Sequence, residues 1–179
     1  MGDIKKHAQK YSQATNPFYK EKMDELGEEI RDRLLTGLTR RFDIDGNQFK
    51  HLKKSTIAIR GARDINRTSP LRADGGIEEF LQSSNLFKAG SSQVRLNSPT
   101  EEYMIHQNEG FVPKYIPVIA KRGKKRGQVV YKENKKGISV PARKWFGIPK
   151  GYREGGTAYN KFMAKIAEEI EERFGDISK

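Results

Sequence analysis

The sequence contains no cysteine, which excludes disulfide bonds and thiolate chemistry and is compatible with a cytosolic product. It also lacks an apolar run of the ~18–20 residues that a membrane-spanning helix needs, and its N-terminus is polar. We therefore expect no signal peptide, no membrane anchor and no membrane partner. With 179 residues, of which 35% are hydrophobic, the chain is long enough to bury the core of one domain.

Residues typical of catalytic and metal sites are also scarce. The three histidines, His7, His51 and His106, are scattered without the spacing of metal ligands. There is no glycine-rich phosphate motif, no serine nucleophile motif and no carboxylate pair that stands out from the surface ones. For His106, a hydrogen-bonded structural role beside Gln107 is favoured over a catalytic one. We therefore predict no catalytic residue, no cofactor and no metal, and an interaction protein rather than an enzyme.

Positive charge, in contrast, is abundant and concentrated in one segment. The net charge is +12, and residues 121–136 hold eight lysines and arginines against the single acid Glu133. These basic residues are Lys121, Arg122, Lys124, Lys125, Arg126, Lys132, Lys135 and Lys136. Apolar residues on both sides predict two edge strands joined by a positive tip, a basic β-arm at about residues 118–138. The arm is either a solvated protrusion or a contact with DNA or an acidic partner, since so many like charges repel one another.

A long amphipathic helix is predicted to begin at Asn16-Pro17. Asparagine is a favoured N-cap, and proline suits the first helical position because its missing N–H would be unpaired there. Apolar residues then recur every three or four residues and form one stripe. The stripe consists of Met23, Leu26, Ile30, Leu34, Leu38 and Phe42. Residues 1–15 lack such a stripe, and we predict a flexible arm there, followed by a single domain over residues 16–179.

A second helix is predicted to begin near Thr157, because apolar residues keep helical spacing from Tyr159 to Phe174. Between the two helices the patterns are short. Residues 43–47 predict a tight turn rather than a calcium loop, and residues 55–60 a short strand. Residues 61–76 predict an arginine-bearing loop, which is either solvated or in contact with a carboxylate or phosphate.

Residues 86–97 predict a β-hairpin around a Gly-Ser-Ser turn, because Val94 and Leu96 alternate with the polar Arg95. Residues 101–107 predict a compact apolar element with polar ends. Together these elements indicate an α+β fold, in which a long N-terminal and a C-terminal helix pack on a small, mostly antiparallel sheet with projecting loops.

The only tryptophan lies in the segment I-S-V-P-A-R-K-W-F-G-I-P, residues 138–149. Its two prolines exclude a central strand or an unbroken helix, because proline lacks a backbone donor and fixes φ. Trp145 and Phe146 could together remove ~300–500 Å² from water. The segment is therefore either a loop that fills the core or, with Arg143, part of a subunit contact. For Arg143 we predict hydrogen bonds to backbone carbonyls or to a carboxylate, which fix the segment while the two rings pack.

Several short motifs occur in a fixed order along the chain. D-G-N-Q-F at 45–49 follows the first long helix, I-H-Q at 105–107 precedes Gly110, and V-P-A-R-K-W-F-G-I occupies 140–148 before the last helix. In this order the chain resembles the virion morphogenesis, or tail completion, family of tailed bacteriophages and prophages of the Mu-like type. The resemblance extends over about residues 17–175.

The resemblance implies a structural virion protein of the phage neck, similar to tail terminators. It would form a ring of six copies at the head-proximal end of the tail, complete the tail and support head–tail joining. Its partners would be further copies of itself, the tail tube and the connector proteins of the head and neck, with packaged DNA in the lumen. It would assemble in the cytoplasm of the bacterial host. The residues expected to form a structural box or subunit contact are His106, Gln107, Pro141, Arg143, Trp145 and Phe146.

Two alternatives remain open from the sequence. One is a head-closure or adaptor protein of the neck, which would co-purify with DNA-filled heads rather than with finished tails. The other is a nucleic-acid-binding module, whose affinity for duplex DNA would fall steeply with salt and depend on Lys124, Lys125 and Arg126. Against the second, only Tyr131 lies near the basic tip for base stacking, and no predicted helix presents a positive face to a groove.

Overall fold

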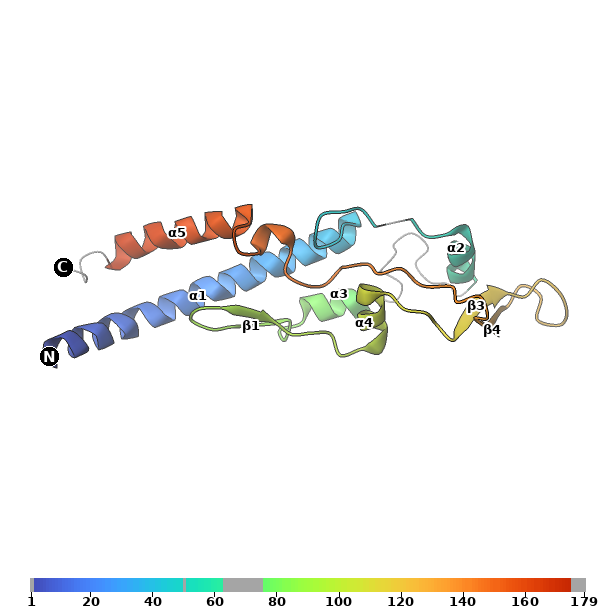
Figure 1. The fold of residues 1–179 in the computed structure, drawn as a ribbon, viewed down its shortest axis with the longest axis horizontal. Coiled ribbons are helices and arrows are strands. Elements are labelled where there is room, and N and C mark those ends of the chain that lie inside the picture. Colours follow the sequence, from blue (N-terminus) through green and yellow to red (C-terminus); the bar gives the residue numbers. More distant parts are fainter. Residues whose placement is uncertain (1, 50, 63–75, 175–179) are drawn as a thin grey trace. The chain divides into compact units, whose positions relative to one another are not determined.

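The computed structural model describes residues 2–49, 51–62 and 76–174 (Figure 1). As expected, the fold is α+β, and the strands of the described residues form two separate two-stranded antiparallel sheets. The chain divides into two compact units. The first unit comprises residues 1–33, 84–97 and 148–179, and the second unit residues 34–83 and 98–147. None of the described helices is long and apolar enough to cross a membrane.

Helix α1 spans Gly2–Arg40 and contributes to both units. The predicted helix start at Asn16 is therefore wrong. Residues 3–16 contain neither glycine nor proline, so nothing in their backbone opposes helix, and Pro17 lies inside the helix. The Asn16 side chain does not cap a terminus but donates its Nδ2 proton to Ser12 Oγ at 3.2 Å, one turn earlier. Whether residues 1–15 move as a flexible arm stays a prediction.

In the first unit, α1 lies beside α5, Thr157–Phe174, which begins where the sequence predicts. The predicted stripe is buried in this part of α1, with Met23, Leu26 and Ile30 all at most 9% exposed. Phe162 and Ile166 are the buried residues of α5. Burial of such side chains supplies most of the stability of a helix pair, because each contributes roughly 1.5–3 kcal/mol.

The predicted hairpin in the first unit is confirmed. It pairs β1, Phe87–Ala89, with β2, Val94–Leu96, in antiparallel register. The ring of Phe87 lies over Gly27 of α1, where an added Cβ would be 2.3 Å from the ring. The guanidinium of Arg31 lies 5.0 Å from the centroid of the same ring. Gly27 therefore allows the hairpin to approach α1, which explains a helix-weakening residue inside the helix.

A nearly buried lysine joins α1 to α5. Lys22 Nζ donates to Glu25 Oε1 at 2.8 Å and to Glu169 Oε2 at 2.9 Å, and its side chain is only 5% exposed. The hydrogen bond to Glu25 raises the pKa of Lys22, against the effect of desolvation. The hydrogen bond from Lys22 is the main cause that lowers the pKa of Glu169. Both shifts favour the charged forms, so the cluster stabilises the helix pair at neutral pH.

We expect Lys22→Met to lower the midpoint of thermal unfolding by on the order of 5 °C, because two carboxylates lose their shared cation. The raised pKa of Lys22 gives stability that is complete below its ordinary value of 10.5 and is lost as pH rises through the folded-state value. The lowered pKa of Glu169 gives stability present above 4.5 and lost as pH falls through the folded-state value. The difference between the two proteins should therefore be largest between about pH 5 and pH 10.

The measurement is thermal unfolding followed by circular dichroism across this pH range. Lys20→Met is the matched control, because Lys20 is exposed on the same helix. An equal loss for Lys20→Met, or a difference that does not depend on pH, would contradict the role of the cluster.

The second unit begins with the last turns of α1 and a tight turn at residues 43–47, as predicted. Asp43 Oδ1 accepts the backbone N–H of Asp45 at 2.9 Å and of Asn47 at 2.7 Å, which fixes the turn. Among the described residues, this unit also contains α2, Lys54–Gly61, α3, Gly76–Gln82, and α4, Glu102–Glu109. Its hydrophobic core consists of Leu34, Leu38, Phe49, Ile77, Leu81, Met104 and Trp145.

The predicted strand at residues 55–60 is wrong, because these residues lie in helix α2. Ile57 and Ile59 would form one face of a strand, but Ile57 is 39% exposed and no residue of α2 is buried. Without a buried face or a paired strand, local helical hydrogen bonds such as Ile57 N–H to Lys53 O, at 3.1 Å, are the more stable choice. Of the predicted arginine-bearing loop at 61–76, residues 63–75 lie outside the described residues.

Candidate functional site

Trp145 anchors the Pro-Ala-Arg box, the name we use for residues 140–148. The indole is 3% exposed, and its Nε1 donates to the backbone oxygen of Met104 in α4 at 3.3 Å. Phe80 of α3 meets it edge-on, with ring centroids 6.2 Å apart and an interplanar angle of 88°. Phe146, half-buried beside it, lies 5.7 Å from the same Phe80 ring. The irregular box therefore fills the core of the second unit, the first of the two roles expected from the sequence.

Arg143 links the box to the His-Gln segment through both its backbone and its side chain. The backbone N–H donates to the backbone oxygen of Gln107 at 2.9 Å, and Nη1 donates to Gln107 Oε1 at 3.0 Å. Burial, and secondarily the charge of Arg60, lowers the pKa of Arg143. The predicted carboxylate or backbone-carbonyl partner is thus replaced by a side-chain amide oxygen, which accepts without adding a second buried charge.

Two further connections hold the box in place. Phe111 and Val140 exchange backbone hydrogen bonds of 3.1 and 2.8 Å, and the amide oxygen of Asn108 accepts the Phe146 N–H at 3.0 Å. On the other side, the backbone oxygen of Lys144 accepts the Ile44 N–H at 2.8 Å. Asn108 was not predicted from the sequence, because its role depends on a residue 38 positions later.

The His106 side chain stacks on a neighbouring ring, whereas the sequence favoured a hydrogen-bonded structural role beside Gln107. Its ring stacks on Phe111, with centroids 4.4 Å apart and an interplanar angle of 14°. Its Nε2 lies 3.8 Å from Glu102 Oε1, one helical turn earlier on α4.

Pro141 is exposed and so does not add to the buried core of the box. In the described part of the chain, no group of three or more His, Asp or Glu side chains is arranged to hold a metal ion.

We expect Arg143→Ala to destabilise the protein by about 1.5–3 kcal/mol, the usual effect of losing a hydrogen bond to a charged group. A double-mutant cycle with Gln107→Ala measures the pair directly in urea denaturation, and we expect a coupling of about 1 kcal/mol. Arg143→Lys keeps the charge without the planar fork and should recover only part of the loss. If Arg143→Ala cost the same stability in the wild type and in the Gln107→Ala variant, the side-chain contact would contribute nothing.

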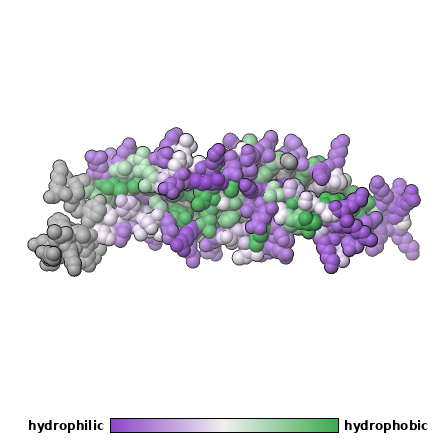
Figure 2. Space-filling model, viewed as in Figure 1, coloured by the Kyte–Doolittle hydropathy of each residue, from purple (hydrophilic) through white to green (hydrophobic). Residues whose placement is uncertain are grey.

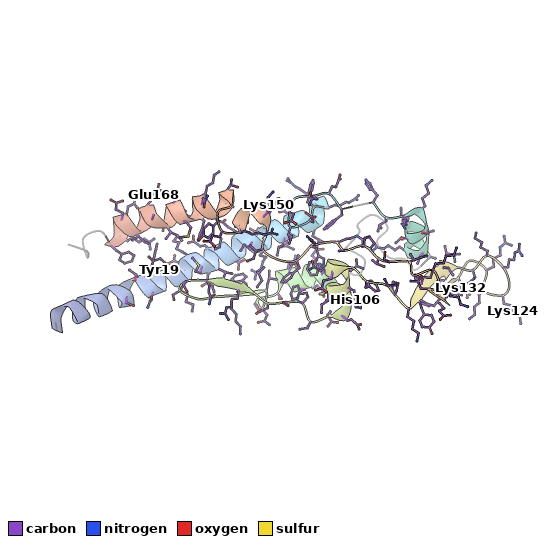
Figure 3. The ribbon with its side chains drawn as sticks, viewed as in Figure 1. Tyr19, His106, Lys124, Lys132, Lys150 and Glu168 are labelled. Carbon is purple, nitrogen blue, oxygen red and sulfur yellow. The ribbon has the colours of Figure 1, made fainter. Side chains whose placement is uncertain are left out.

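The basic arm is the second feature of the site, and its predicted hairpin is confirmed. It pairs β3, Tyr115–Ile119, with β4, Val129–Glu133, in antiparallel register, with Pro117 opposite Tyr131. The tip is closed by two backbone hydrogen bonds of 2.9 Å between residue 120 and residues 127 and 128. All of residues 121–128 are exposed, and hydrophilic side chains cover this tip in Figure 2. Figure 3 labels Lys124 in the tip loop and Lys132 on β4.

The base of the arm carries an open, largely apolar groove. Its volume is about 510 Å³, and its lining residues are His106, Phe111, Val112, Pro113, Lys114, Tyr115 and Tyr131. Val112, Tyr115 and Tyr131 are 62%, 52% and 60% exposed, which is high for such large side chains. Of these three exposed side chains, only Tyr131 was indicated by the sequence, as a ring near the basic tip. Alternation along the hairpin could have indicated Tyr115 as well, because both rings project from the same face in this register.

The predicted residues thus fall into two groups within the second unit. Gln107, Arg143, Trp145 and Phe146 form one hydrogen-bonded and packed structure, whereas the lysines and arginines of the arm are exposed. No family model, curated protein or solved structure matches the chain.

Proposed function

We propose that this chain is a structural virion protein of a tailed phage or prophage. In this proposal, copies of the chain form a ring at the head-proximal end of the tail, complete the tail and support its joining to the head. The ring has six copies, as the family resemblance implies. The protein performs no catalysis, and it functions in the virion after assembly in the host cytoplasm.

One observation carries the proposal. The two segments on which the resemblance depends, I-H-Q at 105–107 and the Pro-Ala-Arg box, are joined through Arg143 and Gln107, 36 residues apart in sequence. Contact between the two motifs is expected if both maintain one piece of the architecture that the family resemblance implies. The exposed basic hairpin adds support, because a ring subunit needs projecting surfaces that meet a different surface on its neighbour.

A second candidate is a DNA-contacting neck protein, such as a head-closure or adaptor protein. The observation that favours it is charge: the second unit has 20 lysines and arginines against 10 acids, and so carries +10 of the +12 net charge. Such a protein would contact packaged DNA through the arm, and its affinity would fall with salt.

The test is deletion of the gene from the phage or prophage that encodes it, followed by electron microscopy of the particles. We expect DNA-filled heads and free, unfinished tails of irregular length, with complementation by the wild-type gene. Finished tails of uniform length beside unclosed heads would favour the head-closure candidate. Normal head-joined tails without the protein would refute both.

Co-purification gives an independent readout. A tagged protein is expected to be recovered with finished tails, including those from a mutant that makes no heads. Recovery only with DNA-filled heads would assign the protein to the other side of the head–tail joint.

A further inference from the structure

We propose that the groove at the base of the basic arm binds helix α5 of a second copy of this chain. The inference rests on the proposed ring, and it names the two surfaces that would meet. Both surfaces are exposed in the described structure, and they differ from each other. Contacts between two different surfaces generate rings when the rotation between copies closes.

The groove is apolar in the middle, with Lys114 in its lining, and a neighbouring acid at the α4 side is Glu102, 3.8 Å from His106. Tyr115 and Tyr131 lie diagonally on one face of the hairpin and form one wall together with Val112. A hairpin of two five-residue strands with no buried residue is marginal by itself, so a covering partner would stabilise it. Residues 114–136 carry nine lysines and arginines, and the one acid, Glu133, lies 3.9 Å from Lys135. The groove therefore suits a ligand that is both apolar and negatively charged.

The exposed face of α5 has this combination. Ala164, Ala167, Glu168 and Glu171 lie on the side of the helix opposite the buried Phe162 and Ile166, and all four are exposed. Met163, at the edge of this face, is 41% exposed. The alanines are small enough for tyrosine rings to pack close to the helix, and the glutamates would meet the lysines at the groove's rim.

The glutamates of this face are available for a partner. Among the described residues, neither Glu168 nor Glu171 has an ion pair, whereas Glu169 on the other side is held by Lys22. Glu168 and Glu172 are also one helical turn apart, where like charges destabilise a helix. Opposite charges at the rim would set the orientation of the helix in the groove.

The test reverses charge on each surface separately. The groove variant is Lys114→Glu with Lys135→Glu, and the helix variant is Glu168→Lys with Glu171→Lys; all four side chains are exposed, so the fold should tolerate them. Native mass spectrometry and light scattering report assembly of the purified full-length protein. We expect the wild type to assemble and each variant alone to remain monomeric.

Mixing the two variants is the decisive step. Each variant keeps one normal surface, so an equimolar mixture should assemble into oligomers in which the two proteins alternate, with an even number of copies. The chain with all four substitutions should also assemble, because the charges of its groove and of its helix are both reversed and so remain opposite. The control is Lys88→Glu with Arg95→Glu, which makes the same charge change on the exposed β1–β2 hairpin and should assemble like the wild type.

The apolar part of the contact has its own test. Tyr131→Ala should prevent assembly, and Tyr131→Phe should preserve it, because packing of the ring needs no hydroxyl. Unchanged circular dichroism would show that the exposed substitution leaves the fold intact.

Other outcomes would overturn the proposal in distinguishable ways. If the wild type assembles and neither variant differs from it, another surface forms the ring and the proposed function stands. If the four-substitution chain assembles but the mixture of groove and helix variants does not, then the groove meets the helix of its own chain, not that of a second copy. If the groove variant assembles normally but loses salt-dependent affinity for duplex DNA, the basic surface is a nucleic-acid contact. A wild type that stays monomeric would also refute this contact, while the tail phenotype of the deletion still decides the function.

Discussion

Trp145→Ala is expected to destabilise the protein by about 3–5 kcal/mol, the range observed when a buried aromatic side chain is reduced to a methyl group. The indole is 3% exposed and contacts the ring of Phe80 edge-on. Its removal would leave a cavity between α3, α4 and the Pro-Ala-Arg box, and it would remove the indole hydrogen bond to the backbone oxygen of Met104. The loss should exceed that of any other single ring in the box.

The measurement is urea denaturation followed by far-UV circular dichroism, because the variant lacks the only tryptophan and cannot be followed by its fluorescence. Trp145→Phe is expected to recover most of the loss, since it keeps a ring against Phe80 and gives up only the indole hydrogen bond. Tyr131→Ala, in the same unit but 60% exposed, should change the stability by less than about 0.5 kcal/mol. An unchanged urea midpoint for Trp145→Ala would show that the box is not part of the core.

Gly110→Ala is the second large effect that we expect, with a loss of about 2–4 kcal/mol. Gly110 ends α4 with φ 80° and ψ 159°, a conformation essentially restricted to glycine. A Cβ at this position would lie 2.7 Å from the backbone nitrogen of Ala142 and 2.9 Å from the backbone oxygen of Val140. The chain would have to move away from the box, and the backbone pair between Phe111 and Val140 would be lost.

Gly46→Ala separates the cost of the backbone conformation from the cost of the close approach to the box. Gly46 also has a positive φ, of 88°, but a Cβ there would meet nothing within 4 Å. Its substitution should therefore cost only the backbone penalty of about 1–2 kcal/mol. Urea denaturation of both variants provides the comparison. Equal losses at the two positions would contradict the close approach of the box to Gly110.

The residues of the box and those that contact it act in different ways, so their substitutions are expected to differ in effect. Trp145 acts through volume and burial, Gly110 through backbone conformation, and Arg143 through one amide oxygen at 3.0 Å. A change at Pro141, which is exposed, should have little effect on stability. If Pro141 affects tail assembly without affecting stability, it belongs to a surface that meets a partner.

Local patterns in the sequence were sufficient for most of the regular elements. The three- and four-residue spacing predicted the buried stripe of α1 and the helix α5. Alternation predicted the β1–β2 hairpin, and the apolar residues that flank the basic run predicted the β3–β4 hairpin. The composition also predicted the exposed basic tip, because charged side chains are rarely buried without partners. These features depend on residues that are neighbours along the chain, which is why the sequence alone determined them.

Other features depended on contacts that no local pattern contains. Six residues with isoleucines at alternate positions suit a strand or a helix. In the described part of the chain no strand pairs with them, and residues 54–61 form helix α2. The partner of Arg143 and the acceptor of the Trp145 indole lie 36 and 41 residues away, so only the folded chain could identify Gln107 and Met104. The groove likewise exists because strand register brings Tyr115 near Tyr131. The sequence thus determined most of the helices and strands and their charge, whereas the tertiary structure decided which distant groups meet.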